Sequence, residues 1–429
     1  MTEETSRPTL FAVHCVDTEG PLEEPLEATF ERVRTHFGID LPPSREMLRA
    51  LQEARVDLNG LEQRIARWLA PERLHYLSTW SDVEEMIGAV TSETFRRTYS
   101  DPLGNPYAFT WFVIDVVGYR DNPRRKALGF HAVWDVYARL LRNALHYDSV
   151  GWHFHTVPVG NHALHYNTCW TNNDFHEQSL ARRLVERQSF PSVFRAGGVI
   201  ERNDLSFWLE QFIPFDFSSA VTSGGGSPGA ISDWRHAPLD WAGYHPSYYD
   251  YRRPGPMRRW IFRCLEVSGY ETTTTAAEIE SAFSQVRSGK SAVLAYSGHD
   301  RRDLRPEVKK AAELIREVSS GYPDVAWQWA NGLDAARAFA GLSDVSRPKF
   351  TLEWQGQTLW IRSDRPLFGP TPFLAVEELG QVFFRDNPTI ESETEWAYRP
   401  PRKSSTLRVG IAGATPAGGV GVSVMPVST

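Results

Sequence analysis

The sequence contains four short clusters whose residue types and spacing could carry chemistry. In the first, VDTEG, Asp17 and Glu19 follow an apolar run and are two residues apart. Carboxylates at a strand end can bind a metal or act as a general base. In the second, GWHFH, His153 and His155 are also two residues apart. In an extended strand such a pair points to one side, so both imidazoles could bind one divalent metal such as Zn²⁺.

The other two clusters add an arginine and a third histidine. Arg195 lies in FRAGG, where its guanidinium could hold a catalytic carboxylate or bind an acidic or hydroxyl-rich substrate. His299 lies in SGHD, where it could act as a general acid oriented by the neighbouring Asp300. Each cluster also has a structural interpretation: a solvated loop, an aromatic strand with incidental histidines, or a surface salt bridge. The segment after His155 supplies three further histidines, His162, His165 and His176.

Each of these clusters ends a segment that the pattern of apolar residues predicts to be a strand. The predicted strands cover residues 10–20, 75–80, 107–119, 148–158, 192–198, 215–220, 260–268, 291–300 and 325–332. The predicted helices cover residues 44–70 with a break at Asn59-Gly60, a segment capped by Ser81 and Glu84, and residues 129–146, 177–188, 203–211, 276–286 and 306–319. Such alternation is typical of a parallel α/β sheet or barrel, whose active site lies at the carboxyl ends of the strands.

The pattern changes near Ser346. From Lys349 onward apolar and polar residues alternate, turn residues are frequent, and no helical period is present. We therefore expect two domains, a β/α domain over residues 1–345 and a β-sandwich-like accessory domain over residues 346–429. The second should pack against the first or position a glycan, and should hold no catalytic residue.

Composition excludes several classes of function. The chain of 429 residues has 41% hydrophobic and 23% charged residues, and its net charge of -7 comes from interleaved acidic and basic residues, which argues against a nucleic acid partner. Three cysteines without a CxxC pair argue against a disulfide framework or a cysteine zinc site. The sequence shows no signal peptide pattern and no membrane span, so we expect a cytoplasmic protein. The many aromatic residues suit either a large core or sugar stacking.

Taken in order, the motifs resemble those of a known superfamily. The succession VDTEG, HFH, FRAGG, FDFSS and SGHD resembles the polysaccharide deacetylase (NodB-homology, carbohydrate esterase) superfamily, in particular its branch with D-x-E and H-x-H motifs. The segment YHPSYYDYRRPG, residues 244–255, is similar to a substrate-loop segment of that branch. The resemblance extends over roughly residues 8–335, with departures in the spacing of the acids and histidines and at Gly198, where a basic residue is frequent.

This resemblance implies an irregular (β/α) barrel and a role for each motif. His153 and His155 would bind a divalent metal, which we expect to be Zn²⁺, and Asp17 and Glu19 would share the roles of catalytic base and metal ligand. We assign Glu19 to the metal ligands, and Asp17, Arg195 and His299 to the catalytic residues. Which of the two carboxylates is the base and which is the ligand is left open. Arg195 would orient the base, and His299 would be the general acid. The substrate would be an N-acyl amino sugar of a polysaccharide or its precursor.

Two alternatives remain at the level of sequence. The first is a glycosidase on a related barrel, in which Asp115 would partner Asp17 across a sugar, with the two carboxylates about 5–9.5 Å apart. The second is a catalytically inactive carbohydrate-binding protein that keeps the aromatic barrel and lacks the metal. The histidine pair has no obvious role in the glycosidase hypothesis, which we therefore rank below a deacetylase.

Overall fold

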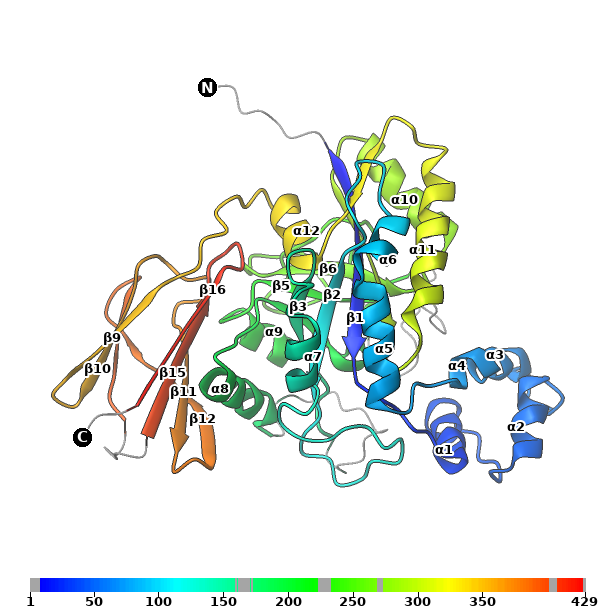
Figure 1. Ribbon diagram of the computed structural model, residues 1–429, viewed down its shortest axis with the longest axis horizontal. Coiled ribbons are helices and arrows are strands. Elements are labelled where there is room, and N and C mark those ends of the chain that lie inside the picture. The colour runs from blue at the N-terminus through cyan, green and yellow to red at the C-terminus, as the bar shows by residue number, and fades with distance from the viewer. Residues whose placement is uncertain are drawn as a thin grey trace.

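The computed structural model describes residues 8–158, 160, 170, 173–222, 233–267, 273–400 and 407–426. Its centre is a barrel of seven parallel strands, closed because β1 pairs with β2 on one edge and with β7 on the other (Figure 1). The strands are β1 (Thr9–Thr18), β2 (Phe109–Asp115), β3 (Ser149–Phe154), β4 (Val193–Ala196), β5 (Phe215–Ser219), β6 (Trp260–Glu266) and β7 (Ala292–His299). The predicted α/β barrel is thus confirmed.

The barrel is irregular where β1 changes partner. The first half of β1 pairs with an eighth strand, β8 (Ala326–Trp329), through residues 9–12, and the second half pairs with β2 through residues 14–18. β8 thus lies beside the first half of β1 as an additional strand next to the closed barrel. All the strand pairs of this sheet are parallel, so the carboxyl ends of β1 to β7 lie at one end of the barrel.

The period of two along each strand separates an inner from an outer face. The inner face is filled by apolar side chains, namely Phe11, Val13, Cys15, Phe112, Val193, Phe215, Phe217, Phe262, Cys264, Val293 and Ala295. Because inward residues alternate, the next inward position on β1 after Cys15 is Asp17, and the next on β7 after Ala295 is Ser297. The barrel interior thus changes from apolar to polar toward the carboxyl ends of its strands.

Helices cover the outer face, where two further apolar clusters join the strands to them. They are α5 (Trp80–Thr91), α6 (Glu93–Thr98), α7 (Trp134–Leu140), α8 (Phe175–Arg187), α9 (Asn203–Leu209), α10 (Ala276–Arg287) and α11 (Leu304–Ser319). The last, α12 (Gly332–Phe339), adds Ala335 and Ala336 to the cluster inside the barrel and lies at the end where β1 begins (Figure 1). It thereby closes the end of the barrel opposite the polar clusters.

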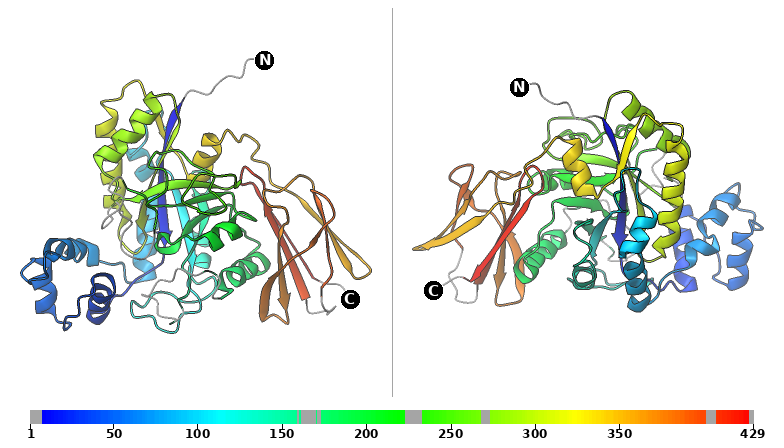
Figure 2. Two further views of the ribbon diagram at one scale, coloured as in Figure 1. Left: turned by 180° about the vertical axis from the view of Figure 1, so that it is seen from behind. Right: turned by 45° about the horizontal axis from the view of Figure 1, so that its top comes forward.

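A small helical group projects from the carboxyl end of β1 (Figures 1 and 2). It comprises α1 (Leu26–Phe37), α2 (Arg45–Gln52), α3 (Glu62–Trp68) and α4 (Pro71–Leu74), which enclose their own apolar cluster. The break predicted at Asn59-Gly60 falls between α2 and α3, as expected.

Two predictions in this region are wrong. Residues 75–80 form no strand, and α5 begins at Trp80 instead of after Ser81. The cap is Thr79, whose hydroxyl accepts from the backbone N–H of Asp82, while the Asp82 carboxylate accepts from the backbone N–H of Thr79. The chain therefore uses the same reciprocal capping chemistry two residues earlier, because the Thr79–Asp82 pair has the spacing that this motif requires.

The C-terminal region forms two antiparallel sheets, which confirms the predicted all-β region. Their strand orders are β13-β14-β10-β9 and β12-β11-β15-β16. The strands are β9 (Phe350–Gln355), β10 (Thr358–Ser363), β11 (Phe373–Glu378), β12 (Val382–Asp386), β13 (Thr389–Ile390), β14 (Glu395–Tyr398), β15 (Leu407–Ala414) and β16 (Val420–Pro426). One apolar cluster contains residues of both sheets, including Ile361, Trp396 and Ile411, as in a sandwich.

The sandwich packs on the barrel through α8. Phe190, Phe373 and Phe383 join an apolar cluster with Leu184 of this helix, and Arg182 stacks on Phe383. The views agree that the two sheets lie beside α8, on the side of the barrel opposite the group of α1 to α4 (Figures 1 and 2). The division into two independent domains near residue 346 stays a prediction. No helix among the described residues is long and apolar enough to span a membrane.

Candidate metal centre

The carboxyl ends of four barrel strands bring the predicted clusters together. β1 supplies Asp17 and is followed by Glu19, β3 supplies His153 and is followed by His155, β4 supplies Arg195, and β7 ends at His299. All six side chains are largely buried, and His299, with 15% of its side chain exposed, is the most accessible of them. Residues far apart in the sequence therefore form one polar cluster at the carboxyl ends of the barrel strands.

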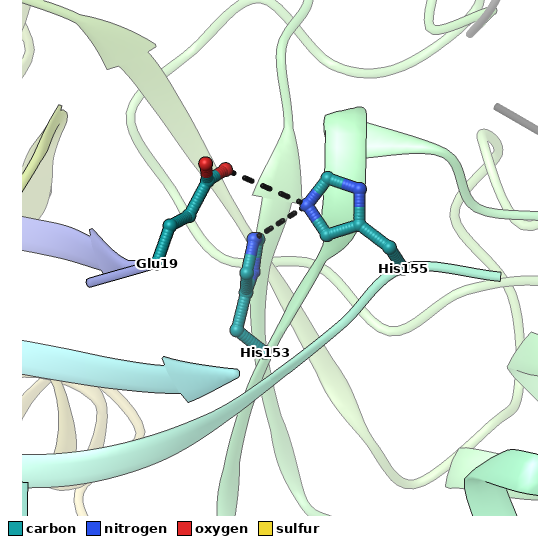
Figure 3. Close-up of side chains that lie close together, drawn as sticks. All are labelled: Glu19, His153 and His155. Atoms are coloured by element: carbon teal, nitrogen blue, oxygen red, sulfur yellow. Dashed lines mark hydrogen bonds and ion pairs between the residues drawn. The ribbon is translucent and has the colours of Figure 1, made fainter. Parts of the chain in front are cut away.

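Glu19, His153 and His155 form a group that could hold a metal ion. Each offers one ligand atom, and these atoms lie within 4.8 Å of one another. The Nε2 atoms of His153 and His155 are 3.1 Å apart, and the Nε2 of His155 is 3.8 Å from Oε1 of Glu19 (Figure 3). Two nitrogen ligands of a tetrahedral zinc ion are about 3.3 Å apart when each Zn–N bond is about 2.0–2.1 Å. The spacing of the histidines fits such an ion.

The protonation of His153 also fits a metal ligand. Its Nδ1 lies 2.9 Å from the carbonyl oxygen of Arg195 and must donate its hydrogen there, which leaves Nε2 with a lone pair. Burial lowers the pKa of His153, and burial together with the neighbouring His153 ring and the Lys126 ammonium holds the pKa of His155 well below its usual range. Both rings are therefore neutral at pH 7, the form that binds metals.

The glycine after Ala196 allows His155 to approach β4 closely. A Cβ atom at Gly197 would lie 2.3 Å from Cδ2 of His155, a distance that real Cβ atoms do not reach. The FRAGG motif thus has two functions in this structure, since Arg195 reaches into the site and Gly197 makes room for the second histidine.

Two cations hold the second oxygen of Glu19. Arg301 donates from Nη1 to Oε2 at 2.5 Å, and the Lys126 ammonium forms an ion pair with the same oxygen. Burial alone would raise the pKa of Glu19, but the charges of Arg301 and Lys126 outweigh it and hold that pKa well below its usual range. Glu19 is therefore ionised, with Oε1 directed at His155 (Figure 3).

Lys126 and Arg301 were not among the residues predicted from sequence. A usable signal was present, because both follow barrel strands in the chain: Lys126 ends the basic run RRK after β2, and Arg301 directly follows SGHD. Both cations position the Glu19 carboxylate, and no motif at the end of a strand contains them.

Asp300 does not orient His299 as expected. Its carboxylate accepts from the backbone N–H groups of Glu19 at 2.7 Å and Gly20 at 2.8 Å, and from the hydroxyl of Tyr137 at 2.6 Å. Burial raises the pKa of Asp300 to about 7. The carboxylate thus holds the turn that follows β1, and through that turn it places Glu19.

Asp17 lies beside the histidines but outside the ligand group. Nε of Arg195 donates to both of its oxygens, at 3.0 and 3.1 Å, and the guanidinium also binds the carbonyl oxygen of Phe217 and the hydroxyl of Ser297. Asp17 Oδ1 is 3.7 Å from Nδ1 of His153, and Oδ2 is 3.8 Å from Nε2 of His299. Burial works against the charge of Arg195, but the Asp17 carboxylate more than compensates and raises the pKa of Arg195. Arg195 therefore orients Asp17 between two imidazoles.

His299 is neutral at pH 7 in this arrangement. Burial and then the charge of Arg301 hold its pKa well below the usual range, while Glu19 acts in the opposite direction. A proton received by this imidazole would be released readily, which suits a group that passes protons on.

Other residues singled out in the sequence lie elsewhere. Asp115 is buried and forms an ion pair with Arg183 of α8 at 2.6 Å, so it is held toward the helices. His176 packs between Trp170 and Trp208 in the core, where burial lowers its pKa to about 4. The segment 244–255 packs beside β6, and Tyr244 pairs there with Ile261. His162 and His165 lie outside the described residues.

Comparison with known proteins adds little. No protein-family model matches this chain, and neither does any curated protein. Among solved structures, a Cellulomonas fimi endo-beta-1,4-mannanase double mutant is similar at 12% identity, covering 79% of this chain and 89% of that chain, with a TM-score of 0.20. A TM-score this low supports no inference about function.

Proposed function

We propose that this protein is a metal-dependent hydrolase that removes an N-acyl group, such as acetyl, from an amino sugar of a polysaccharide or its precursor. The observation that carries the proposal is the convergence of the ligand atoms of Glu19, His153 and His155 beside the Arg195–Asp17 pair and His299. The order of the corresponding motifs along the chain, which resembles that of the polysaccharide deacetylases, supports the choice of reaction.

Glu19, His153 and His155 would hold the metal. Two neutral imidazoles and one carboxylate form a ligand set typical of catalytic zinc sites, which leave a coordination position open. A divalent metal bound there would activate a water molecule and polarise the acyl carbonyl group. The chain prepares for this by fixing the His153 tautomer through Arg195 and the Glu19 carboxylate through Lys126 and Arg301.

Asp17 and His299 would move the protons. Asp17, hydrogen-bonded to Arg195, would take a proton from the attacking water. His299 lies 3.8 Å from Asp17 and would pass this proton to the amine nitrogen as the carbon–nitrogen bond breaks. The proton taken from water ends on the amine nitrogen, so Asp17 and His299 return to their starting protonation states. The products are the free amine and the carboxylic acid.

The geometry favours this reaction over a glycosidase. A glycosidase needs two carboxyl groups facing each other across the sugar. Asp115, the partner that the sequence suggested for Asp17, is held by Arg183 on the helical side of β2. The remaining carboxylates, Asp17 and Glu19, follow one strand two residues apart, and Glu19 already belongs to the ligand group.

The proposal is tested by metal analysis coupled to product release. The purified protein should bind one zinc ion per chain after treatment with a chelator and reconstitution, and should release acetate from at least one member of a panel of N-acetylated glycans. His153→Ala should abolish both, whereas His146→Ala, an exposed histidine that stacks on Tyr147, should change neither. A folded protein that binds no divalent metal would contradict the proposal and would favour the inactive carbohydrate-binding alternative.

A further inference from the structure

The site contains more positive charge than its carboxylates balance. Arg195 is paired with Asp17, but a single oxygen of Glu19 receives both Lys126 and Arg301. Three cationic side chains, Arg195, Lys126 and Arg301, therefore form ion pairs with only two carboxylates, Asp17 and Glu19. A bound divalent metal would increase the excess.

Lys126 lies on a loop that internal hydrogen bonds hold in place at the site. The side chain of Asn122 bridges the loop, since its amide nitrogen donates to the carbonyl oxygen of Lys126 and its amide oxygen accepts from the Lys126 N–H. The two residues before Lys126 are also fixed, because Arg124 pairs with Glu24 and Arg125 pairs with Glu23. Three consecutive basic residues thus pair with three acidic residues that follow β1.

These three ion pairs differ in their surroundings. The Arg125–Glu23 pair is exposed, with 60% and 57% of the two side chains accessible, whereas Lys126 keeps 9% and Glu19 keeps 3%. An exposed pair is screened by water, but an excess charge in a largely buried site is stabilised only by a partner of opposite charge. Among the described residues Glu19 is the sole partner of the Lys126 ammonium, so two of its three N–H donors are left for a ligand.

We propose that the substrate supplies the missing negative charge, so that the amino sugar carries an acid group, a carboxylate or a phosphate, which binds Lys126 and Arg301. The substrate class rests on the proposed function, while the binding of an acidic sugar can be measured without it. Lys126 is then a specificity-determining residue, because ammonium and guanidinium groups form their strongest hydrogen bonds with such anions.

The test is titration calorimetry with sugars that differ in charge. The probes are methyl glucoside, glucuronate, glucose 6-phosphate and inorganic sulfate, each added to metal-free and to zinc-loaded protein. We expect glucuronate or glucose 6-phosphate to bind at least about 10-fold more tightly than methyl glucoside, as for one charge-assisted contact. The preference between the carboxylate and the phosphate identifies which acid group the site takes.

Two variants and one control decide whether Lys126 is responsible. Lys126→Met should remove the preference for the acidic sugar while keeping the thermal transition of the wild type, and Arg301→Met should do the same. Arg125→Met breaks the neighbouring exposed pair and should leave the preference unchanged. Wild-type protein that binds methyl glucoside as tightly as the acidic sugars, or a Lys126→Met variant that keeps the preference, would overturn the proposal.

The remaining outcomes are also informative. Sulfate that binds as tightly as the acidic sugars would overturn the proposal, because it would show an anion site without selectivity for a sugar. Loss of the proposed function would look different: the protein would bind no zinc and release no acetate, while a Lys126-dependent preference for acidic sugars would persist in the metal-free protein.

Discussion

Two buried arginine–aspartate pairs lie at opposite ends of the barrel, and their environments differ. At the end where the strands begin, Arg96 of α6 binds Asp148 through two hydrogen bonds of 2.7 and 2.6 Å. The same carboxylate accepts from the backbone N–H of Phe109 at 2.9 Å and from the indole of Trp111 at 2.8 Å. Asp148 thus receives four donors and contacts no other titratable group that the structure describes.

At the other end, the Asp17 carboxylate accepts fewer hydrogen bonds. A single nitrogen of Arg195 is shared between its two oxygens, and the two nearest imidazoles lie 3.7 and 3.8 Å away, beyond hydrogen-bonding distance. A buried carboxylate whose acceptors are all used stabilises the fold, whereas one with unused acceptors beside titratable groups can take part in proton transfer. The comparison distinguishes a structural pair from a reactive one of the same composition.

The largest expected effect falls on the metal ligands. We predict that His153→Ala loses bound zinc and with it all measurable hydrolysis, because one of three protein ligands is removed. Zinc affinity, measured by competition with a chelator, should fall by more than about 100-fold, the upper range for changes to groups that only support a ligand. Retention of zinc by the folded variant would show that the Glu19, His153 and His155 group is not the metal site.

The next effect separates proton transfer from metal binding. His299→Ala should keep its zinc and its fold but lose about 10²–10⁴-fold in turnover, the usual contribution of a general acid or base. The measurement is kcat on the best substrate of the acetate-release panel, with metal content determined in parallel. Full activity in this variant would make His299 structural and would remove the functional contrast between Asp17 and Asp148.

The structural pair should respond in the opposite way. Arg96→Met leaves Asp148 buried without its cation and should lower the free energy of unfolding by about 3–5 kcal/mol, measured by urea denaturation. The folded fraction should bind zinc normally. Arg97→Met is the matched control, since the neighbouring Arg97–Glu93 pair is half exposed and should contribute less than about 1 kcal/mol. A loss of zinc in Arg96→Met would mean that the two ends of the barrel are coupled.

The smallest effect concerns a third buried carboxyl group, Glu307 of α11. Its Oε2 has no hydrogen-bond partner in the described structure. This oxygen and Nε2 of His14 both lie next to Gly298, at the place where a Cβ atom would be. Burial raises the pKa of Glu307 to about 7, so the native state keeps its proton between about pH 4.5 and 7 while the unfolded state loses it. Stability should therefore fall as pH rises through this range, by up to about 3 kcal/mol from this group.

Glu307→Gln should remove this part of the pH dependence. The measurement is the free energy of unfolding at a series of pH values between 4.5 and 8, and the variant should give the flatter curve. Glu313→Gln, on the same helix with an exposed side chain paired to Lys309, serves as the control and should follow the wild type. Equal slopes in wild type and Glu307→Gln would show that the group is already ionised at pH 5.

The pattern of apolar residues along the chain is enough to predict the strands that carry the site and the side to which their residues point. β3 and β7 lie within the predicted segments, and β1 begins one residue before its segment. The spacing of two residues places His153 beside His155 through the alternation of side chains along extended backbone. The parallel arrangement could be predicted from the alternation of strands and helices, and it brings the strand ends together. These features depend on local periodicity, which is readable in a single chain.

The partner of each charged group, in contrast, depends on the folded arrangement of the whole barrel. Glu19 and Arg301 are 282 residues apart in the sequence, and Asp300 binds the backbone of Glu19 and Gly20 rather than its neighbour His299. Asp115 ends the strongest predicted strand, yet it points to Arg183 of a later helix. Hydrogen bonds and ion pairs act over about 3–4 Å, so their partners depend on how the barrel closes and where its loops cross, and no local pattern along the chain contains that information.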